Sequence, residues 1–268
     1  MFDIHENIRG QIKVKEWLPL RHLVAKCYGL VDWIASKMFY LILAENSYEP
    51  IYQKISKHYS IVLNLPDVNG LKEFVVEDRR AIDNGILYIG GVTEQRGIFE
   101  VVEALVILKD KKVPFHFHCV GPIADNLMAV LEEKEAFRKV KENITFYGLL
   151  PIYEAYSYSR KCKVGLSILH PIENYLKSYS TKIFEYMAIG LPFIVSDFEL
   201  YNFVEKQNVG RSVDPVSVQM IAKTLEEMLT DADGSGVMGR NGLNVVNQEY
   251  TWESQERKLL EAYGELTS

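Results

Sequence analysis

One carboxylate stands among residues that otherwise resemble buried core. In the stretch TKIFEYMAIGLPFIVSD, residues 181–197, apolar residues recur at helical spacing. Gly190 is expected to end this helix in a left-handed conformation, and the β-branched run after Pro192 predicts a buried strand. On a helical wheel Glu185 falls beside Ala188, at the rim of the apolar stripe and one turn after the helix begins. A carboxylate at that position can face a cleft.

Two glycine-containing loops offer sites for an anion. In GGVTEQRG, residues 90–97, Gly90 and Gly91 permit a phosphate to approach the backbone, and Arg96 carries a fork that matches its oxygens. In HCVGP, Gly121 would let a ligand lie over a strand end. A glycine turn beside a solvated arginine, and an ordinary strand-to-loop glycine, are the alternatives. The spacing lacks both Gly-x-Gly-x-x-Gly and Gly-Lys-Ser/Thr, which argues against dinucleotide dehydrogenases and P-loop enzymes.

The elements that would position these residues alternate along the chain after residue 84. Segments such as IFEVVEALVILKDKK and SVQMIAKTLEEMLTD predict amphipathic helices. Repeated strand-helix-strand order predicts an α/β fold, with a parallel sheet covered on both faces and ligands outside the carboxyl ends of its strands. Helix N-termini at that edge bind phosphate. The predicted strands are GILYIGG, PFHFHCVG, NITFYG, CKVGLSIL, LPFIVSD and VGRSV.

The region before residue 84 differs in pattern. It has one candidate strand end, FDIH, a long helical stretch, and the segment SIVLNLPD, too few strands to close a second sheet. The turn-forming pair Asn84-Gly85 places a boundary near Asp83. We therefore expect a partial N-terminal domain over 1–83, a complete domain over 84–247 and a terminal helix over 248–268. The helical stretch carries Trp17, Leu20, Leu23, Trp33, Phe39 and Leu43.

Composition narrows the class of protein. The chain has 268 residues, is 48% apolar and carries a formal net charge of −6, which predicts a globular protein and argues against a general nucleic-acid binder. Its cysteines, Cys27, Cys119 and Cys162, are far apart, so we expect neither a zinc site nor disulfides but small core residues in a reducing compartment. The apolar stretch LVDWIASKMFYLILA, broken by Asp32 and Lys37, is too short for a membrane span, and no signal-peptide pattern is present.

The run KSYSTKIFEYMAIGLPFIVSD resembles the nucleotide-sugar-binding signature of the two-Rossmann-domain (GT-B) glycosyltransferases of family 4. GILYIGGVTEQRG resembles that family's first C-domain strand and phosphate loop, NITFYGLLPIYEAYSYSRKCKVGLSIL its glycine turn and following helix, and EYTWESQERKLLEAYGEL its terminal helix. FDIHEN and VLNLPD resemble a late strand end and the linker of its N-domain. The resemblance implies one complete Rossmann-like domain plus a partial, acceptor-side N-terminal one, because the first strands of that N-domain have no counterpart here.

The resemblance also implies roles for residues. Glu185 matches the second glutamate of a Glu-x7-Glu motif, which accepts hydrogen bonds from the nucleotide ribose, although a solvated helix residue is the alternative. Lys177 stands where the family has the first glutamate, next to the donor sugar, and this departure leaves open how the transition state is stabilised. Lys177 would contact the diphosphate or remain solvated, and Asn174 would take a sugar hydroxyl.

Basic residues are expected at the donor diphosphate. Arg96 and Lys182 match family positions that face it, where positive charge stabilises the leaving nucleoside diphosphate, so we assign both to catalysis. Ser180 and Thr181 would add hydroxyl and amide donors, or serve as helix caps. Gly91 occupies the position of a usual basic residue, which weakens the site by one charge.

His5 matches an N-domain histidine near the donor sugar and acceptor, and we assign it to catalysis. Asp3 and Glu6 could orient it, although a residue so close to the start of the sequence could also be disordered. The resemblance implies no cofactor and no bound metal, since arginine and lysine neutralise the diphosphate, and the sequence has no Asp-x-Asp.

A basic amphipathic segment follows His5. It could rest on anionic lipid, which would suit a lipid-linked acceptor, but a helix that packs on the missing half of the N-terminal domain is the alternative that we expect. The segment contains Lys13, Lys15, Arg21 and His22 against Glu16, interleaved with Trp17, Leu18 and Leu20.

Together these features predict a cytoplasmic, hexosyltransferase-like glycosyltransferase, with peripheral contact at the inner face of a membrane as an option. It would transfer a sugar from a nucleotide-diphosphate sugar to a polysaccharide or lipid-linked acceptor, with retention of configuration. The alternative is a catalytically incomplete nucleotide-sugar-binding subunit that needs a separate N-terminal half, supplied by a partner chain or a second copy. These motifs do not specify the base or the sugar of the donor, or the acceptor. An NAD-dependent oxidoreductase is disfavoured because its glycine fingerprint is absent from the sequence.

Overall fold

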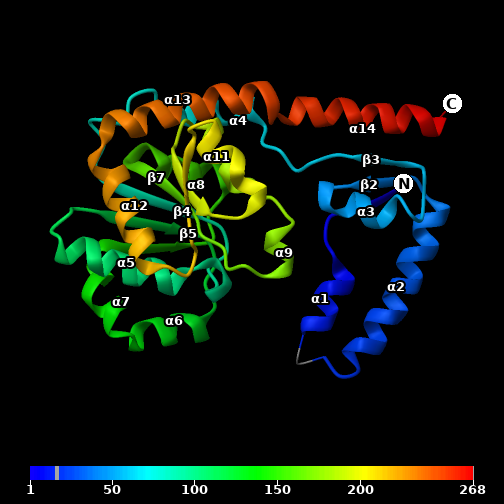
Figure 1. The fold of residues 1–268 in the computed structure, drawn as a ribbon, viewed down its shortest axis with the longest axis horizontal. Coiled ribbons are helices and arrows are strands. Elements are labelled where there is room, and N and C mark those ends of the chain that lie inside the picture. Colours follow the sequence, from blue (N-terminus) through cyan, green and yellow to red (C-terminus); the bar gives the residue numbers. More distant parts are fainter. Residues whose placement is uncertain (16–17, 268) are drawn as a thin grey trace. The chain divides into compact units, whose positions relative to one another are not determined.

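The computed structural model describes residues 1–15 and 18–267, and the chain divides into two compact units. Each unit has its own parallel sheet (Figure 1). The first unit comprises Met1–Leu65, Lys177–Tyr179 and Trp252–Ser268, and the second comprises Pro66–Leu176 and Ser180–Thr251.

The second unit contains a six-stranded parallel sheet in the order β6-β5-β4-β7-β8-β9. All six strands predicted from the sequence are present, which confirms the α/β fold. The chain runs outward from β4 through β5 to β6 and then returns to the other side of β4, so the strand order reverses between β4 and β7, where such sheets bind ligands. The strands are β4 (Gly85–Ile89), β5 (His116–Val120), β6 (Ile144–Gly148), β7 (Cys162–Ser167), β8 (Phe193–Ser196) and β9 (Gly210–Val213).

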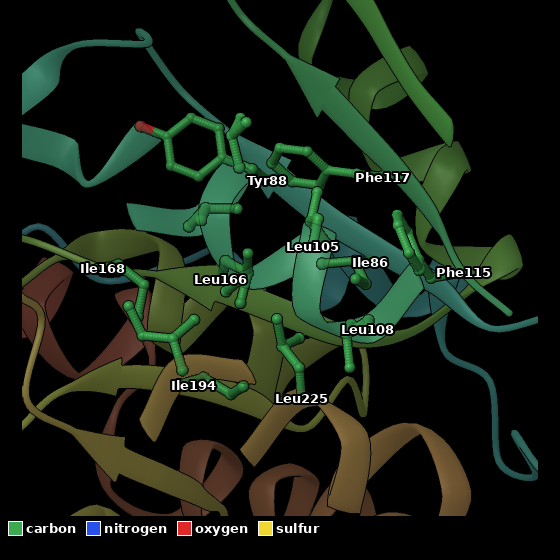
Figure 2. Packing of buried hydrophobic residues seen from close by; sticks show 14 of the residues in the cluster. Ile86, Tyr88, Leu105, Leu108, Phe115, Phe117, Leu166, Ile168, Ile194 and Leu225 are labelled. Atoms are coloured by element: carbon green, nitrogen blue, oxygen red, sulfur yellow. The ribbon is translucent and has the colours of Figure 1, made fainter. Parts of the chain in front are cut away.

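Helices cover this sheet, and the main core lies under α5 (Ile98–Asp110) and α12 (Val218–Thr230). Strand residues such as Ile86 and Leu166 pack there against Leu105 and Leu108 of α5 and Leu225 of α12 (Figure 2). The other helices of the unit are α4 (Val68–Leu71), α6 (Asp125–Glu133), α7 (Glu135–Val140), α8 (Ile152–Ser157), α9 (Glu173–Leu176), α10 (Thr181–Ala188), α11 (Asn202–Lys206) and α13 (Ala232–Glu249).

Helix α10 is fixed to the sheet by one buried tyrosine. The Tyr186 hydroxyl donates to the carbonyls of Leu87 and Leu166 at 3.4 and 3.3 Å and accepts from the Ile89 amide at 3.3 Å. Gly165 makes room for the ring, because a Cβ there would lie 2.7 Å from it. As predicted, α10 ends at a left-handed residue, Gly190, with φ of 64°. The helix that carries Lys182 and Glu185 therefore has a defined position over β4 and β7.

The first unit has a three-stranded parallel sheet in the order β1-β2-β3, with β1 (Phe2–Ile4), β2 (Leu41–Leu43) and β3 (Tyr59–Ile61). Its helices are α1 (Ile8–Val14), α2 (Arg21–Met38), α3 (Glu49–Tyr52) and α14 (Trp252–Thr267). The predicted helical stretch was wrong at its end, because α2 stops at Met38 and Leu43 lies in β2. The three residues of β2 are buried and pair with strands on both sides, which favours an extended conformation for the run.

The division between units falls at Leu65, whereas we expected it near Asp83. Arg79 explains why residues 66–83, which we call the linker segment, belong to the second unit. Its guanidinium is 4% exposed and donates to four backbone carbonyls of that unit at 2.7–3.0 Å, those of Ser159, Cys162, Ile189 and Gly190.

The terminal helix α14 belongs to the first unit. Ala262 packs with Ile42 there, and Gln255 Oε1 accepts from the Leu63 amide at 3.0 Å.

The cysteines differ in their exposure. Cys119 and Cys162 are buried as expected, but Cys27 is exposed on α2, so the prediction of a core position was wrong for that residue. Within the described residues, no helix combines the length and apolarity that crossing a bilayer requires.

Candidate functional site

Two glycine loops meet at the carboxyl ends of β4 and β5. Gly90 and Gly121 have φ of 136° and 141°, a region that side chains disfavour. The Gly90 amide donates to Val120 O at 2.8 Å. A Cβ on Gly121 would lie 2.0 Å from Gly90 O, so the two loops can approach this closely only because the residue is glycine.

Arg96 and Lys182 converge on this point from different elements. A Cβ built on Gly90 would lie 3.3 Å from Arg96 Nη1 and 3.4 Å from Lys182 Nζ. Arg96, in the 3-10 turn Glu94–Arg96, donates from Nη1 to Gly91 O at 3.1 Å. Lys182 Nζ lies 4.6 Å from the ring centroid of Tyr88. Two cationic groups thus lie beside one glycine at the carboxyl end of β4, and we call Gly90, Arg96 and Lys182 the basic cluster.

The charge of Lys182 is poorly solvated. Its side chain is buried, with 8% exposed, and burial together with repulsion from Arg96 lowers its pKa to about 7, although Glu185 acts in the opposite direction. An anion at the basic cluster would favour the charged form of the lysine. The basic cluster therefore holds positive charge that is neither solvated nor neutralised, and a bound anion would stabilise it.

Glu185 lines a separate pocket of the second unit. Burial raises the pKa of its carboxyl group, while the neighbouring Tyr156 hydroxyl and Lys182 lower it. The pocket is bounded by the linker segment and α4 on one side and by α8 on the other. Its lining residues are Pro66, Asp67, Gly70, Leu71, Ile152, Tyr153, Tyr156 and Glu185.

Sequence reasoning singled out only Glu185 among these lining residues. Tyr153 and Tyr156 lie three apart in IYEAYSYS, a spacing that places them near one face of α8 and is equally typical of a core helix. Asp67 accepts from the Gly70 amide at 3.0 Å as the N-cap of α4. No spacing in the sequence connects α8 with the linker segment, so the pocket required the fold.

The start of α10 presents Ser180 and Thr181. The Ser180 side chain makes no cap hydrogen bond; its hydroxyl accepts from Ser167 Oγ at 2.9 Å, and its amide donates to Tyr201 Oη at 2.9 Å. The Ser180 side chain therefore does not cap the helix, which was the alternative role that we considered for it. Thr181 is exposed at the first position of the helix.

The segment before α10 contains the two residues that were expected near the donor sugar. Asn174 is exposed in α9, and its neighbour Tyr175 interacts by a side-chain hydrogen bond with Arg96. Tyr175 was missed, since nothing in the sequence distinguishes it from other loop tyrosines. Lys177 is exposed and belongs to the first unit.

His5 also belongs to the first unit and follows β1. Its Nε2 lies 2.8 Å from Asp3 Oδ2, and its Nδ1 lies 3.3 Å from Asn64 Nδ2. Asp3 thus makes the contact that was predicted to orient the ring. Glu6 does not share it, because Glu6 instead accepts from Gln11 Nε2 at 2.9 Å.

Two further expectations concern metals and the basic segment. Among the residues that the structure describes, no group of three or more His, Cys, Asp or Glu side chains could hold a metal ion. Glu16 and Trp17 of the basic segment lie outside the described residues.

The family follows from a match to the model of glycosyl transferases group 1 over residues 83–231, more than half of the chain. The chain belongs to the group 1 glycosyl transferases. No protein among the curated sequences matches it.

Solved structures share the fold. Sucrose-phosphate synthase from Thermosynechococcus elongatus matches 99% of this chain and 67% of its own, with 18% identity and a TM-score of 0.73. Anabaena HepE in complex with UDP and glucose matches 98% of this chain and 70% of its own, with 13% identity and a TM-score of 0.69. The C-terminal domain of a Francisella tularensis group 1 glycosyl transferase, LpcC, matches 69% of this chain and 98% of its own, with 20% identity and a TM-score of 0.57. These glycosyltransferase neighbours confirm the predicted GT-B type of α/β fold.

Proposed function

We propose that this chain transfers a sugar from a nucleotide-diphosphate sugar to a polysaccharide or lipid-linked acceptor, as a retaining, family 4 type glycosyltransferase. The observation that carries the proposal is the convergence of Arg96 and buried Lys182 on Gly90, with Glu185 one helical turn further along α10. Family membership supports transfer of a glycosyl group. HepE, which shares the fold, has been solved with UDP and with UDP-glucose, in agreement with a nucleotide-sugar donor.

The diphosphate would occupy the basic cluster. Arg96 offers a planar fork and Lys182 a point charge, and together they suit the oxygens of two linked phosphates. The left-handed backbone at Gly90 and Gly121 leaves space for close approach, and Gly91 adds to this space. At the start of α10, amide donors of Thr181 and the Ser180 hydroxyl would add hydrogen bonds where the helix dipole favours an anion.

The nucleoside would extend from the diphosphate toward the pocket of Glu185. The Glu185 carboxylate can accept from both ribose hydroxyls at once. It lines the pocket and lies on the same helix as Lys182 of the basic cluster, so the ribose would lie between the diphosphate and the base. Tyr153 and Ile152, which line the same pocket, would offer apolar surface to the base.

Transfer would break the bond between the anomeric carbon and the diphosphate oxygen, and the electron pair would leave with the nucleoside diphosphate. Arg96 and Lys182 would stabilise the negative charge that develops on this leaving group. The acceptor hydroxyl would attack the anomeric carbon from the face that the diphosphate leaves, which retains the configuration. Its proton would pass to an oxygen of the departing nucleoside diphosphate. His5, oriented by Asp3, would lie near the sugar and acceptor, with Asn174 and Lys177 as further contacts.

We propose that no metal takes part, because two cationic side chains converge on Gly90, where the diphosphate would lie. We further propose that the chain is active in the cytoplasm.

The edges of the first unit's sheet support the second candidate, a nucleotide-sugar-binding subunit that needs a complementing α/β segment. Its sheet has three parallel strands, with β1 at an edge, and parallel sheets of this size are usually extended or covered. A partner chain or a second copy would supply the missing cover. Alone, the chain would then bind donor but transfer slowly, since positioning of the acceptor can supply ~7–11 kcal/mol of the barrier reduction.

Two measurements on the same sample test these candidates. The melting temperature of the chain should rise with a UDP-, GDP- or TDP-sugar, by mass action, if the donor site exists. Turnover is then assayed with lipid-linked acceptors on material shown to be monomeric by light scattering. Robust turnover by the monomer would exclude the subunit candidate. Failure of every nucleotide sugar to raise the melting temperature would contradict the proposed donor site.

A further inference from the structure

Helix α2 in the first unit places its small and polar residues inward. Its two buried residues are Ala25 and Ser36, within a helix whose every residue is described. The Ser36 hydroxyl donates to Asp32 O at 2.7 Å, and Asp32 accepts from the Tyr52 hydroxyl at 3.1 Å. The inward face of α2 therefore carries small and polar side chains, and Asp32 links it to Tyr52 of α3.

Large apolar residues lie on the opposite face. At 100° per residue they span an arc of roughly 120° that contains no polar residue other than the thiol of Cys27. Leu30, Val31 and Met38 are 60%, 62% and 70% exposed. The exposed residues of this face, which we call the α2 stripe, are Leu23, Val24, Cys27, Leu30, Val31, Ile34 and Met38.

The border of the α2 stripe is basic. Lys26 and Lys37 are exposed along one side, and Lys37 Nζ lies 4.4 Å from the ring centroid of Trp33, which is itself 44% exposed. Asp32 is the one acidic residue in the helix sequence, and it faces Tyr52 rather than the border. An apolar stripe beside lysines and a tryptophan, with no exposed carboxylate in α2, has the composition of an interfacial helix.

We infer that the α2 stripe docks on an anionic lipid surface, with its apolar side chains among the acyl chains and Lys26 and Lys37 at the headgroups. Charge complementarity favours this occupant over a second copy of the chain. Two copies of α2 packed together would bring the same basic border to both sides of the interface, whereas anionic headgroups would neutralise it. The chain as a whole has a net charge of −6, so attraction to such a surface would be confined to this part.

The inference does not depend on the donor site, and vesicle flotation without nucleotide tests it. We expect the full chain to float with vesicles of phosphatidylcholine and phosphatidylglycerol. It should float much less with phosphatidylcholine alone or at 0.5 M salt, because the Debye length falls there to roughly 4 Å and the attraction to the headgroups is screened. Lys26→Glu combined with Lys37→Glu should lower partitioning by more than about tenfold.

A matched pair of variants separates the α2 stripe from general hydrophobicity. Leu30 on α2 and Leu260 on α14 are 60% and 62% exposed in the same unit. Leu30→Asp should abolish flotation, whereas Leu260→Asp should leave it unchanged, with equal melting temperatures as the check on folding.

Absence of flotation by the unmodified chain, or equal flotation by the two variants, would overturn the inference. A dimer that Leu30→Asp dissociates, together with no vesicle binding, would assign the α2 stripe to a second copy instead.

Discussion

Helix α10 in the second unit and helix α2 in the first distribute their side chains in opposite ways. In α10, Lys182 is 8% exposed and lies close to Arg96, whereas in α2, Met38 and Val31 are 70% and 62% exposed. Burying a charge is costly unless a partner offsets it, and exposing an apolar face is costly unless something covers it. Each helix therefore indicates a binding partner through the residues that its own unit leaves unsatisfied: an anion for α10 and an apolar, anionic surface for α2.

Glycine substitutions give the largest expected contrast between the units. Gly121→Ala places a Cβ 2.0 Å from Gly90 O on a backbone with φ of 141°, so we expect a loss of more than about 2 kcal/mol in unfolding free energy together with loss of nucleotide binding. Gly264→Ala, in helix α14 where a Cβ meets nothing within 4 Å, should instead gain ~0.5–1 kcal/mol. Urea unfolding measures both, and similar effects of the two variants would contradict the described contact between the glycine loops.

The ribose role of Glu185 predicts the next largest effect. Glu185→Ala should weaken binding of a nucleoside diphosphate by ~1.5–3 kcal/mol, because the hydrogen bonds lost are to a charged group. Glu154→Ala, on the exposed side of α8, is the control and should leave affinity unchanged. Calorimetric titration of both variants measures the difference; unchanged affinity in Glu185→Ala would remove the ribose role.

Lys182 predicts a pH dependence. Its pKa in the folded chain is lowered from 10.5 to about 7, so between these values the unfolded chain holds a proton that the folded chain lacks, and stability should rise as pH increases through that window. A bound diphosphate favours the protonated lysine, so affinity should fall as pH rises above about 7, by at most about tenfold per pH unit.

Lys182→Met should remove both slopes, since methionine cannot take up the proton. Titrations of UDP from pH 6.5 to 9, with melting curves in the same buffers, measure them in both proteins. Identical slopes with and without the lysine would assign the pH dependence to another group.

How far the sequence predicted the structure differs between the units. Six strands and the helix-glycine-strand order around Gly190 follow from local patterns, and Arg96 and Lys182, though 86 positions apart, were linked through the family resemblance. The linker boundary could not be predicted, because Arg79 contacts carbonyls that lie 80–111 positions away along the chain. Strand β2 was missed for a related reason. Its three residues adopt a strand only because β1 and β3 lie on either side, and a run that short carries no period of its own.

Tyr175 and the exposed position of Cys27 show the same limit. The interaction of Tyr175 with Arg96 depends on where the loop after β7 returns, and the exposure of Cys27 depends on which face of α2 turns inward. The sequence indicated a long helical stretch in this region but not which face of it is exposed. The direction of the α2 stripe, rather than its presence, is the basis for the lipid-docking inference.

The central claim is that the second unit binds a nucleoside diphosphate through its basic cluster, and Arg96 tests it most directly. Calorimetry with UDP and with uridine, on the unmodified chain and on Arg96→Ala, separates phosphate contacts from nucleoside contacts. Arg96 is placed beside Gly90 and away from the pocket of Glu185, so the variant should lose at least about tenfold in affinity for UDP and keep its affinity for uridine. Equal losses for the two ligands, or no loss for UDP, would contradict the account.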